Sequence, residues 1–283
     1  MSVSIEGGRT FPVWWPPTAV SALPSDLVVV SVNYNTKPLI ARLLWSLYRF
    51  LGAQVRSVVV VDNGSSDGSA ELLQTLATEG LCQVLHNPQN RQHGPALSQA
   101  LSHLASGHLG QSGTRPWVWL LDSDCIIARS DTAAQAITAA TAAGAAIVGE
   151  SRWNPWHRQE RFCGFSLLLD PAWCWRAEIG AFEDGGDPVG DFEQSCRTNG
   201  VPAQSFPFAK EGYVIHLGRS TLAGVRKRNE TAHPLFGWAQ SHHKPHFEQV
   251  SGAQGRYGAL VKQFHHEVPG LSADALVRAC GKR

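Results

Sequence analysis

The stretch SVVVVDNGSSDGSAELLQTL, residues 57–76, decides the fold class of this chain. Its four consecutive valines are typical of a β-strand that is buried on both faces. The Asp-Asn-Gly-Ser sequence that follows is rich in residues that favour turns. Apolar residues at helical spacing then predict a helix, so this short stretch reads as strand, turn and helix.

The same alternation extends in both directions along the chain. Upstream, LVVVSV (27–32) predicts a buried strand and PLIARLLWSLYRF (38–50) a helix, with Pro38 at a favourable first position. Downstream the pattern continues in CQVLHN (82–87), GPALSQALSHLA (94–105), WVWLLD (117–122) and TAAQAITAATAAGAAIVGE (132–150). Strands that alternate with helices in short units predict an α/β fold with a mostly parallel sheet.

Polar side chains follow three of these predicted strands at the point where each strand ends. Asn33, Asp62 and Asp122 each come directly after an apolar run. Ligands of parallel α/β sheets bind at the carboxyl ends of the strands, so these three residues predict a cleft there.

A second carboxylate follows Asp122 at Asp124, in the stretch WVWLLDSDCII (117–127). Side chains alternate along a strand, so the two aspartates point to the same side. Two like charges held close together repel each other and need a positive partner. A metal ion, a lysine or arginine, or water at a strand end would each meet that need.

The composition narrows the function classes. Of the 283 residues, 43% are hydrophobic and 17% are charged, as in ordinary globular proteins, and the net charge of +1 gives no electrostatic footprint for nucleic acid. Six cysteines without a Cys-x-x-Cys pair are typical of reduced thiols. No apolar run approaches the ~20 residues of a membrane span, and the N-terminus lacks a signal-peptide pattern. We therefore expect a cytoplasmic protein without a transmembrane segment, and peripheral attachment to a membrane stays open.

Six sequence motifs occur in a characteristic order between residues 26 and 250. They are VVVSVNYNTKPLIARLLWSL, VVVVDNGSSDGS, LLDSDC, FCGFSLLLDPAWCWRAEIGAFED, GDFEQSCRTNG and HLGRS. Together they resemble the motifs of family 2 glycosyltransferases of the GT-A fold. The last motif, residues 216–220, resembles an element of the branch often labelled rhamnosyltransferase.

This resemblance implies a fold and a domain organisation. A GT-A fold has a mostly parallel, Rossmann-like nucleotide-binding sheet with helices on both faces and, here, an acceptor-side C-terminal extension. An irregular segment (1–25) would precede the catalytic domain (26–220), and a helical and loop extension (221–283) would follow it. Within the catalytic domain, residues 26–128 would bind the nucleotide sugar and residues 129–220 would face the acceptor.

The resemblance also implies an activity. The expected reaction is the metal-dependent, inverting transfer of a hexose from a dTDP- or UDP-linked sugar to an acceptor hydroxyl by direct displacement. The acceptor (a glycan, a lipid-linked sugar, a peptide or a small natural product) and a homodimeric assembly both stay open. One alternative is a haloacid-dehalogenase-like phosphatase, although its Asp-x-Asp motif normally ends the first strand and here it ends the fourth. The other alternative is a catalytically inactive module that only binds sugar nucleotides.

Three residues are implied for a Mn²⁺ or Mg²⁺ site. Asp122 would contact the ribose and the metal, Asp124 would bind the metal, and His216, after a short strand, would complete the metal or diphosphate site. Hard oxygen ligands suit these ions, which neutralise a departing nucleoside diphosphate as Lewis acids. The alternatives are a solvated strand end for the aspartates and an ordinary histidine for His216.

Further residues are implied for the nucleotide sugar. Asp62 would accept a hydrogen bond from the imide N–H of uracil or thymine, and the alternative is an Asx turn that serves only its own backbone. Asn33, Tyr34 and Asn35 would cradle the base, with Tyr34 stacked on it, unless they are only the polar start of a loop. The remaining implied contacts are Asn90, Ser123, Lys244 and His246, of which the last two would neutralise the diphosphate when a loop closes. A solvated charged face is the alternative for those two.

The general base implied by the family motif is Asp191, at the head of DFEQSCRTNG. Such a base takes the proton of the acceptor hydroxyl as it attacks the anomeric carbon. Asp184 and Asp187 are rival bases, and a helix N-cap is the alternative role for Asp191. Two departures from the family pattern bear on the site: Gly190 stands where a glutamate usually precedes the base, and the loop that begins at Asn90 keeps only part of its usual sequence.

Overall fold

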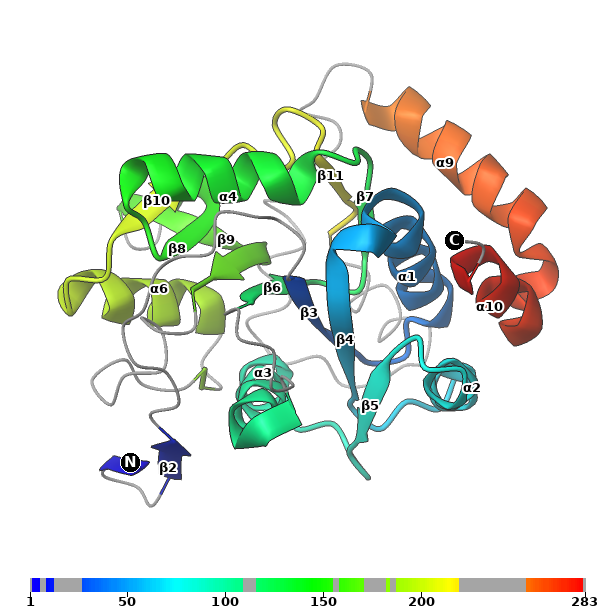
Figure 1. The fold of residues 1–283 in the computed structure, drawn as a ribbon, viewed down its shortest axis with the longest axis horizontal. Coiled ribbons are helices and arrows are strands. Elements are labelled where there is room, and N and C mark those ends of the chain that lie inside the picture. Colours follow the sequence, from blue (N-terminus) through cyan, green and yellow to red (C-terminus); the bar gives the residue numbers. More distant parts are fainter. Residues whose placement is uncertain are drawn as a thin grey trace.

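In the part of the chain that the structure describes, a seven-stranded sheet forms the centre of the molecule (Figure 1). The computed structural model describes residues 2–5, 9–12, 27–108, 116–154, 158–170, 182–183, 187–218 and 253–281. In spatial order the strands are β10 (Ala203–Ser205), β8 (Ile147–Asn154), β9 (Gln159–Leu169), β6 (Trp117–Leu121), β3 (Leu27–Asn33), β4 (Val55–Asp62) and β5 (Gln83–His86). β9 runs antiparallel to both of its neighbours and the other pairs are parallel, so the predicted mostly parallel sheet is confirmed.

The valine-rich strands β3 and β4 lie side by side within this sheet. Every residue of β3 is buried, as are the last five residues of β4. Burial of a valine or leucine side chain contributes about 1.5–3 kcal/mol. Continuous apolar strands are therefore most stable where helices cover both faces of the sheet.

Helices do cover both faces, as the sequence predicts (Figure 1). One side carries α1 (Lys37–Leu51), α2 (Ser69–Thr78) and α4 (Thr132–Ala143), and the other carries α3 (His93–His103) and α6 (Pro188–Thr198). Short helical turns lie at η1 (Gly52–Gln54), η2 (Leu104–His108) and η4 (Pro269–Leu271). Leu44 of α1 shares a buried cluster with Val29, whereas Leu97 of α3 shares another with Val30. Neighbouring residues of one strand thus face two separate helical layers.

The C-terminal helices α9 (Ala253–Glu267) and α10 (Ala273–Gly281) lie in the predicted extension and pack against α1. The carboxylate of Glu267 accepts a hydrogen bond from Trp45 Nε1 (2.9 Å) and pairs with Arg49 (3.0 Å). Phe264 meets the Trp45 ring edge-on, with 5.7 Å between the ring centroids. Among the described residues, none of the helices combines the length and the apolar character that a membrane crossing requires. The domain boundaries that the sequence implies stay predictions.

The N-terminal segment contains two short strands that the sequence analysis does not predict. Residues 1–25 were expected to be irregular, but β1 (Ser2–Ile5) and β2 (Arg9–Pro12) form an antiparallel two-stranded sheet. Val3, Ile5 and Phe11 have high strand propensity, which explains why these two short stretches pair.

Candidate active site

A small two-stranded sheet places His216 beside the Asp-Ser-Asp loop. β7 (Cys125–Ile127) directly follows the loop, and β11 (Val214–His216) pairs with it in antiparallel orientation. In this register His216 lies opposite Cys125, the residue after Asp124. Pairing of two strands that are distant in sequence therefore brings the histidine to the carboxylates.

The three predicted metal ligands, Asp122, Asp124 and His216, come together in one cluster. The Nε2 atom of His216 lies 3.2 Å from Asp124 Oδ1 and 3.7 Å from Asp122 Oδ2. The candidate ligand atoms of all three residues lie within 4.8 Å of one another. Asp124 and His216 are buried, whereas the side chain of Asp122 is 31% exposed. Two carboxylates and one imidazole fit Mn²⁺ or Mg²⁺, and such a set leaves further coordination positions for water and substrate phosphates.

The grouped charges shift the pKa values of this cluster. Burial alone would lower the pKa of His216, but the carboxylates of Asp124 and Asp122 raise it above its ordinary value. The pKa of Asp122 is also raised, mainly by burial, with a further contribution from Asp124, while His93 and His216 act to lower it. A bound divalent cation would compensate the negative charge and compete with protons for the same atoms.

Phe165 of β9 supports the cluster from one side. Its ring stacks on the His216 imidazole, with 4.6 Å between centroids and 12° between planes, and its carbonyl accepts the backbone N–H of Asp122 (3.0 Å). The guanidinium of Arg152 lies 5.8 Å from the centroid of the same ring and pairs with the fully buried Glu150 (2.6 Å). Sequence reasoning missed this cation, because no motif marks it and only the folding of β8 onto β9 brings it here.

His93 is a second residue that sequence reasoning missed. It is the first residue of α3, and its Nε2 atom lies 3.6 Å from Asp122 Oδ1. Its side chain is 39% exposed, so it is accessible to a ligand. The signal that could have found it is its place in the loop that departs from the family pattern.

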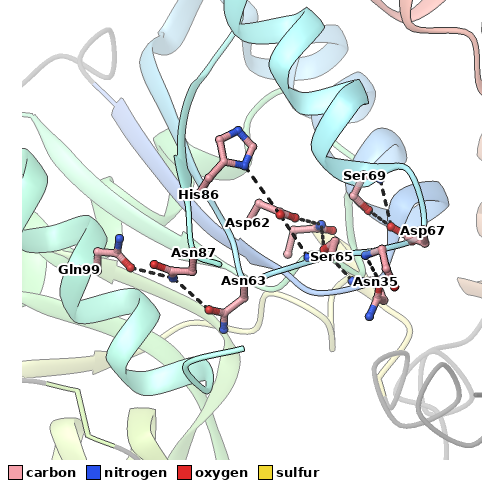
Figure 2. Close-up of polar contacts among 11 residues, drawn as sticks. Asn35, Asp62, Asn63, Ser65, Asp67, Ser69, His86, Asn87 and Gln99 are labelled. Carbon is pink, nitrogen blue, oxygen red and sulfur yellow. Dashed lines mark hydrogen bonds and ion pairs between the residues drawn. The ribbon is translucent and has the colours of Figure 1, made fainter. Parts of the chain in front are cut away.

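The predicted nucleobase side of the site is a hydrogen-bonded network around Asp62 (Figure 2). Asp62 is buried at the end of β4, and its Oδ1 accepts a hydrogen bond from Asn33 Nδ2 (2.9 Å). Its Oδ2 accepts the backbone N–H of Ser65 (3.2 Å), and Nδ1 of His86 lies 3.8 Å away. The local turn bond of the alternative interpretation is therefore present. Each carboxylate oxygen has two lone pairs, so this bond leaves acceptor capacity for a ligand.

The strand-end residues Asn33, Tyr34 and Asn35 are brought to the same edge. Asn33 is fully buried and its amide donates to Asp62 and to Ser65 Oγ (3.0 Å), which indicates a positioning role. Asn35 has a left-handed backbone (φ +54°), and its backbone N–H donates to Ser65 Oγ (2.9 Å). Tyr34 is half-buried beside them. The end of β3 is thereby tied to the turn after β4.

Asn90 lies in a separate network. Its Oδ1 accepts hydrogen bonds from Asn63 Nδ2 (3.0 Å) and from the backbone N–H of Gln92 (2.9 Å). Asn63 Oδ1 in turn accepts from Asn87 Nδ2 (3.0 Å), which also donates to Gln99 (2.9 Å). Figure 2 shows Asn63, Asn87 and Gln99 in this arrangement. Asn90 shapes the loop before α3 in the described structure.

Helix α6 begins earlier than the sequence-based interpretation placed it. That interpretation had Asp191 open the helix, but α6 starts at Pro188 and its N-cap is Asp187, whose side chain accepts the Gly190 N–H (3.0 Å). Proline fits the first helical position because its φ is preset and no N–H is needed there. The N-cap role therefore belongs to Asp187, and Asp191 lies in the first turn.

Asp187 and Asp191 share one buried cation. Arg161 of β9 reaches Asp191 Oδ1 (2.8 Å) and Asp187 Oδ2 (3.3 Å), and its side chain is only 4% exposed. The Asp191 side chain is 60% exposed, so a fixed carboxylate faces solvent. Gly190 makes room for this arrangement, because a Cβ there would lie 2.3 Å from Asp187 Oδ2. The glycine that departs from the family pattern is thus required by the position of Asp187.

Close packing of α3 against the start of α6 links the Asp191 region to the loop of Asp122, Ser123 and Asp124, the predicted metal loop. A Cβ on Gly94 would lie 2.1 Å from the carbonyl oxygen of Glu183 and 2.9 Å from Pro188 Cβ. Ser98 of α3 also donates to the carbonyl of Phe182 (2.8 Å). Since Gly94 follows His93, the helix end that contacts Asp122 also abuts the first residue of α6.

We expect Gly94→Ala to lower the free energy of unfolding by about 1–3 kcal/mol, because the added methyl group overpacks against backbone atoms. Gly258→Ala is a matched control, since Gly258 lies within α9 and a Cβ added there would have no neighbouring atom within 4 Å. Alanine should leave that helix unchanged or stabilise it by up to about 1 kcal/mol. Urea unfolding of both variants measures the difference. Equal stabilities would contradict the close approach at Gly94.

Lys244, His246 and Asp184 lie outside the described residues, so their predicted roles stay predictions.

Comparisons with known proteins agree with this fold. A family model described as glycosyl transferase family 2 matches residues 28–179. A search of curated proteins gave no match. Among solved structures, the chain is similar to the mannosyltransferase PcManGT from Pyrobaculum calidifontis, solved with GDP-Man and Mn²⁺, at 19% identity and a TM-score of 0.52, covering 94% of this chain and 90% of that one. It is also similar to residues 1–349 of S. aureus TarS, at 14% identity and a TM-score of 0.50, covering 91% and 82%. At these identities the structures show a shared fold.

Proposed function

The chain belongs to glycosyl transferase family 2, and from this membership we propose that it catalyses a metal-dependent, inverting sugar transfer. The donor would be a nucleoside-diphosphate sugar, and the acceptor would be a hydroxyl group. The observation that carries the proposal is the cluster of Asp122, Asp124 and His216, with ligand atoms within 4.8 Å. It lies at the edge of the sheet where β3 and β4 also end, beside the network around Asp62.

Each part of the site has one task in this proposal. Asp122, Asp124 and His216 would hold Mn²⁺ or Mg²⁺, which when bound supplies Lewis-acid stabilisation of the departing nucleoside diphosphate. Asp62 would accept the imide N–H of the nucleobase. Asp191, held by Arg161, would take the proton of the acceptor hydroxyl as that oxygen attacks the anomeric carbon.

The donor that we propose rests on the chemistry of Asp62. A carboxylate accepts hydrogen bonds, and uracil and thymine present an imide N–H, so we propose a UDP- or dTDP-linked hexose. Membership of the rhamnosyltransferase branch rests on HLGRS alone and stays a prediction, as do the acceptor class, a homodimer, a cytoplasmic location and peripheral membrane attachment.

The proposal is tested by thermal unfolding with UDP, dTDP and GDP, each with and without Mn²⁺. A ligand at about 100 times its dissociation constant stabilises the native state by about 2.7 kcal/mol. We expect that gain for UDP or dTDP with Mn²⁺ and a much smaller one for GDP or for nucleotide with EDTA. Stabilisation by none of the three nucleotides would contradict the proposal.

Product analysis separates the proposed reaction from the two alternatives. A glycosyltransferase releases nucleoside diphosphate from a sugar nucleotide, whereas a phosphatase releases inorganic phosphate. The phosphatase interpretation is not supported, because the chain belongs to a glycosyltransferase family and its Asp-x-Asp motif follows β6, the fourth strand of the central sheet along the chain. An inactive module would bind the nucleotide sugar without releasing nucleoside diphosphate.

We expect Mn²⁺ affinity in the absence of nucleotide to fall as the pH is lowered from about 8 to about 6. The metal needs neutral His216 and an ionised Asp122, and the pKa values of both groups are raised in the metal-free protein. The loss should therefore begin above pH ~6.5, the ordinary pKa of histidine, and approach tenfold per pH unit for each proton displaced. Titration of Mn²⁺ at several pH values checks this. His86→Gln, outside the cluster, should keep the profile, and a flat profile would exclude His216 as a ligand.

A further inference from the structure

Thr36 joins the two halves of the proposed donor site through its hydroxyl group. Its Oγ1 lies 2.7 Å from Asn33 Oδ1 and 3.0 Å from Ser123 Oγ. Ser123 is the residue between Asp122 and Asp124, and Asn33 donates to Asp62 (2.9 Å). A continuous chain of hydrogen bonds thus runs from the metal loop to the carboxylate at the nucleobase side.

The direction of every bond in this chain is fixed. Asn33 must turn its NH₂ group toward the Asp62 carboxylate, so its Oδ1 faces Thr36 and can only accept. Thr36 has one hydroxyl hydrogen, which it donates to Asn33. It therefore accepts from Ser123, and all donors in the chain point toward Asp62.

Thr36 does not serve the role that its position would normally give it. It is the N-cap residue of α1, where a threonine hydroxyl usually accepts a backbone N–H of the first turn, but its side chain makes no such cap bond. Of the two positions whose N–H a cap would accept, Pro38 has no N–H, and the N–H of Leu39 donates to the backbone carbonyl of Thr36 (2.8 Å). The N–H of Lys37 is accepted by the carboxylate of Asp67 (2.8 Å), close to the turn shown in Figure 2. The Thr36 hydroxyl is thus committed to the chain between the two sites.

The four side chains that these hydrogen bonds connect are all shielded from water. Asn33, Thr36, Asp62 and Ser123 are buried. If one hydroxyl is removed, water cannot easily replace it, and its two neighbours lose a partner. A displacement of Ser123 should therefore also displace Asp62, and the reverse.

We propose that Thr36 is a positioning residue that holds the metal loop and the nucleobase side in one arrangement, so that a single hydroxyl group supports both metal binding and nucleotide binding. This inference rests on the proposed function. Thr36 contacts neither ligand in this scheme. It fixes Ser123 and hence the two flanking metal ligands, and it fixes Asn33 and hence the Asp62 carboxylate. Because both ends depend on the same hydroxyl group, loss of the link should weaken Mn²⁺ binding and UDP binding, each measured without the other ligand.

The test uses Thr36→Val, which keeps the shape of the side chain and removes the hydroxyl. We expect Mn²⁺ affinity without nucleotide to fall by up to about 10-fold, the lower end of the range for loss of a direct outer partner, because Thr36 acts on the two aspartates through Ser123. We also expect UDP affinity in EDTA to fall at least about threefold, because the freed Asn33 no longer fixes Asp62. Mn²⁺ binding is read from the electron paramagnetic resonance signal of the free ion and UDP binding from calorimetry.

Three further variants make the result decisive. Thr36→Ser keeps the hydroxyl and should restore both affinities to within about threefold of wild type. Thr132→Val removes another buried threonine hydroxyl, which bonds the carbonyls of Arg129 (2.7 Å) and Tyr213 (3.3 Å), and should change neither affinity. Ser123→Ala removes the hydrogen bond to Thr36 from the metal side and should lower UDP affinity in EDTA. This variant keeps the test decisive even if Thr36→Val is poorly folded.

The outcomes separate this inference from the proposed function. Wild-type protein that binds neither Mn²⁺ nor any of UDP, dTDP and GDP would overturn the proposed function itself. Wild-type binding of both, with Thr36→Val and Ser123→Ala indistinguishable from Thr132→Val in UDP affinity, would overturn only the role of Thr36. Loss of Mn²⁺ affinity with unchanged UDP affinity would show that Thr36 supports the metal loop alone, and would also overturn its shared role.

Discussion

Asp124→Asn should lower Mn²⁺ affinity by at least about 100-fold and remove the Mn²⁺-dependent part of UDP affinity. Loss of an outer partner already costs about 10–100-fold in metal affinity, so loss of a direct carboxylate ligand should cost more. Asp124 is buried with its Oδ1 3.2 Å from His216 Nε2, the position of a direct ligand. Asparagine keeps the size of the side chain and removes the charge that a divalent cation requires.

The fold should survive this change. The metal-free protein holds Asp122 and Asp124 close together, and removal of one charge relieves their repulsion. We therefore expect the melting temperature without metal to stay near that of wild type. Asp131→Asn is the matched control, since Asp131 is a surface carboxylate paired with Arg129 (2.7 Å). Calorimetry that gives Asp124→Asn the wild-type dissociation constant for Mn²⁺ would exclude Asp124 as a ligand.

The fold could be predicted from the sequence because a strand buried on both faces is a continuous run of apolar residues, which is easy to recognise. The valine runs of β3 and β4 could only be stable inside a covered sheet, and the polar residues after them had to lie at its edge. The register confirms this, since Asn33 pairs with Asp62 and Asp62 with His86. The α/β class and the first half of the site thus followed from local periodicity.

The placement of His216 depended on the family resemblance. Nothing in the local sequence indicates that β11 pairs with β7, and without that pairing His216 is an ordinary strand-end histidine. The structure confirms that it meets Asp122 and Asp124. Its role as a ligand stays a prediction that the pH experiment tests.

Arg161 and Thr36 could not have been found by motif or spacing. Each acts through its side chain, and tertiary packing alone determines which residues that side chain contacts. Arg161 is the one basic residue of β9, and its pairing with Asp187 and Asp191 depends on where α6 docks. Thr36 looks like an ordinary N-cap in sequence, and only its hydrogen-bond partners show that the hydroxyl is used elsewhere.

The start of α6 changes how the general base must be tested. Because Asp187 caps the helix, an Asp191 variant no longer risks loss of a cap. Arg161 would also keep a partner in such a variant, since Asp187 Oδ2 lies 3.3 Å from its Nη1. Asp191→Asn therefore leaves no buried charge without compensation, and its effect on stability should be small.

We expect Asp191→Asn to lower the rate of sugar transfer by about 10²–10⁴-fold, the usual range for loss of a general base. An amide cannot take the proton of the acceptor hydroxyl at neutral pH. Donor affinity should stay within about threefold of wild type, because the base acts on the acceptor alone. Nucleoside-diphosphate release in the presence of an acceptor that the wild-type enzyme uses gives the rate, and calorimetry gives the donor affinity.

Asp187→Asn distinguishes the roles of the two carboxylates that pair with Arg161. Asparagine caps a helix as well as aspartate does, so this variant should fold and keep most of its transfer rate. If Asp191→Asn stays within about threefold of wild type while Asp187→Asn loses the rate, the base is Asp187 and Asp191 only balances Arg161. If both variants lose the transfer rate equally and keep their donor affinity, neither carboxylate alone explains the loss. Transfer then requires the contact that the two carboxylates share with Arg161.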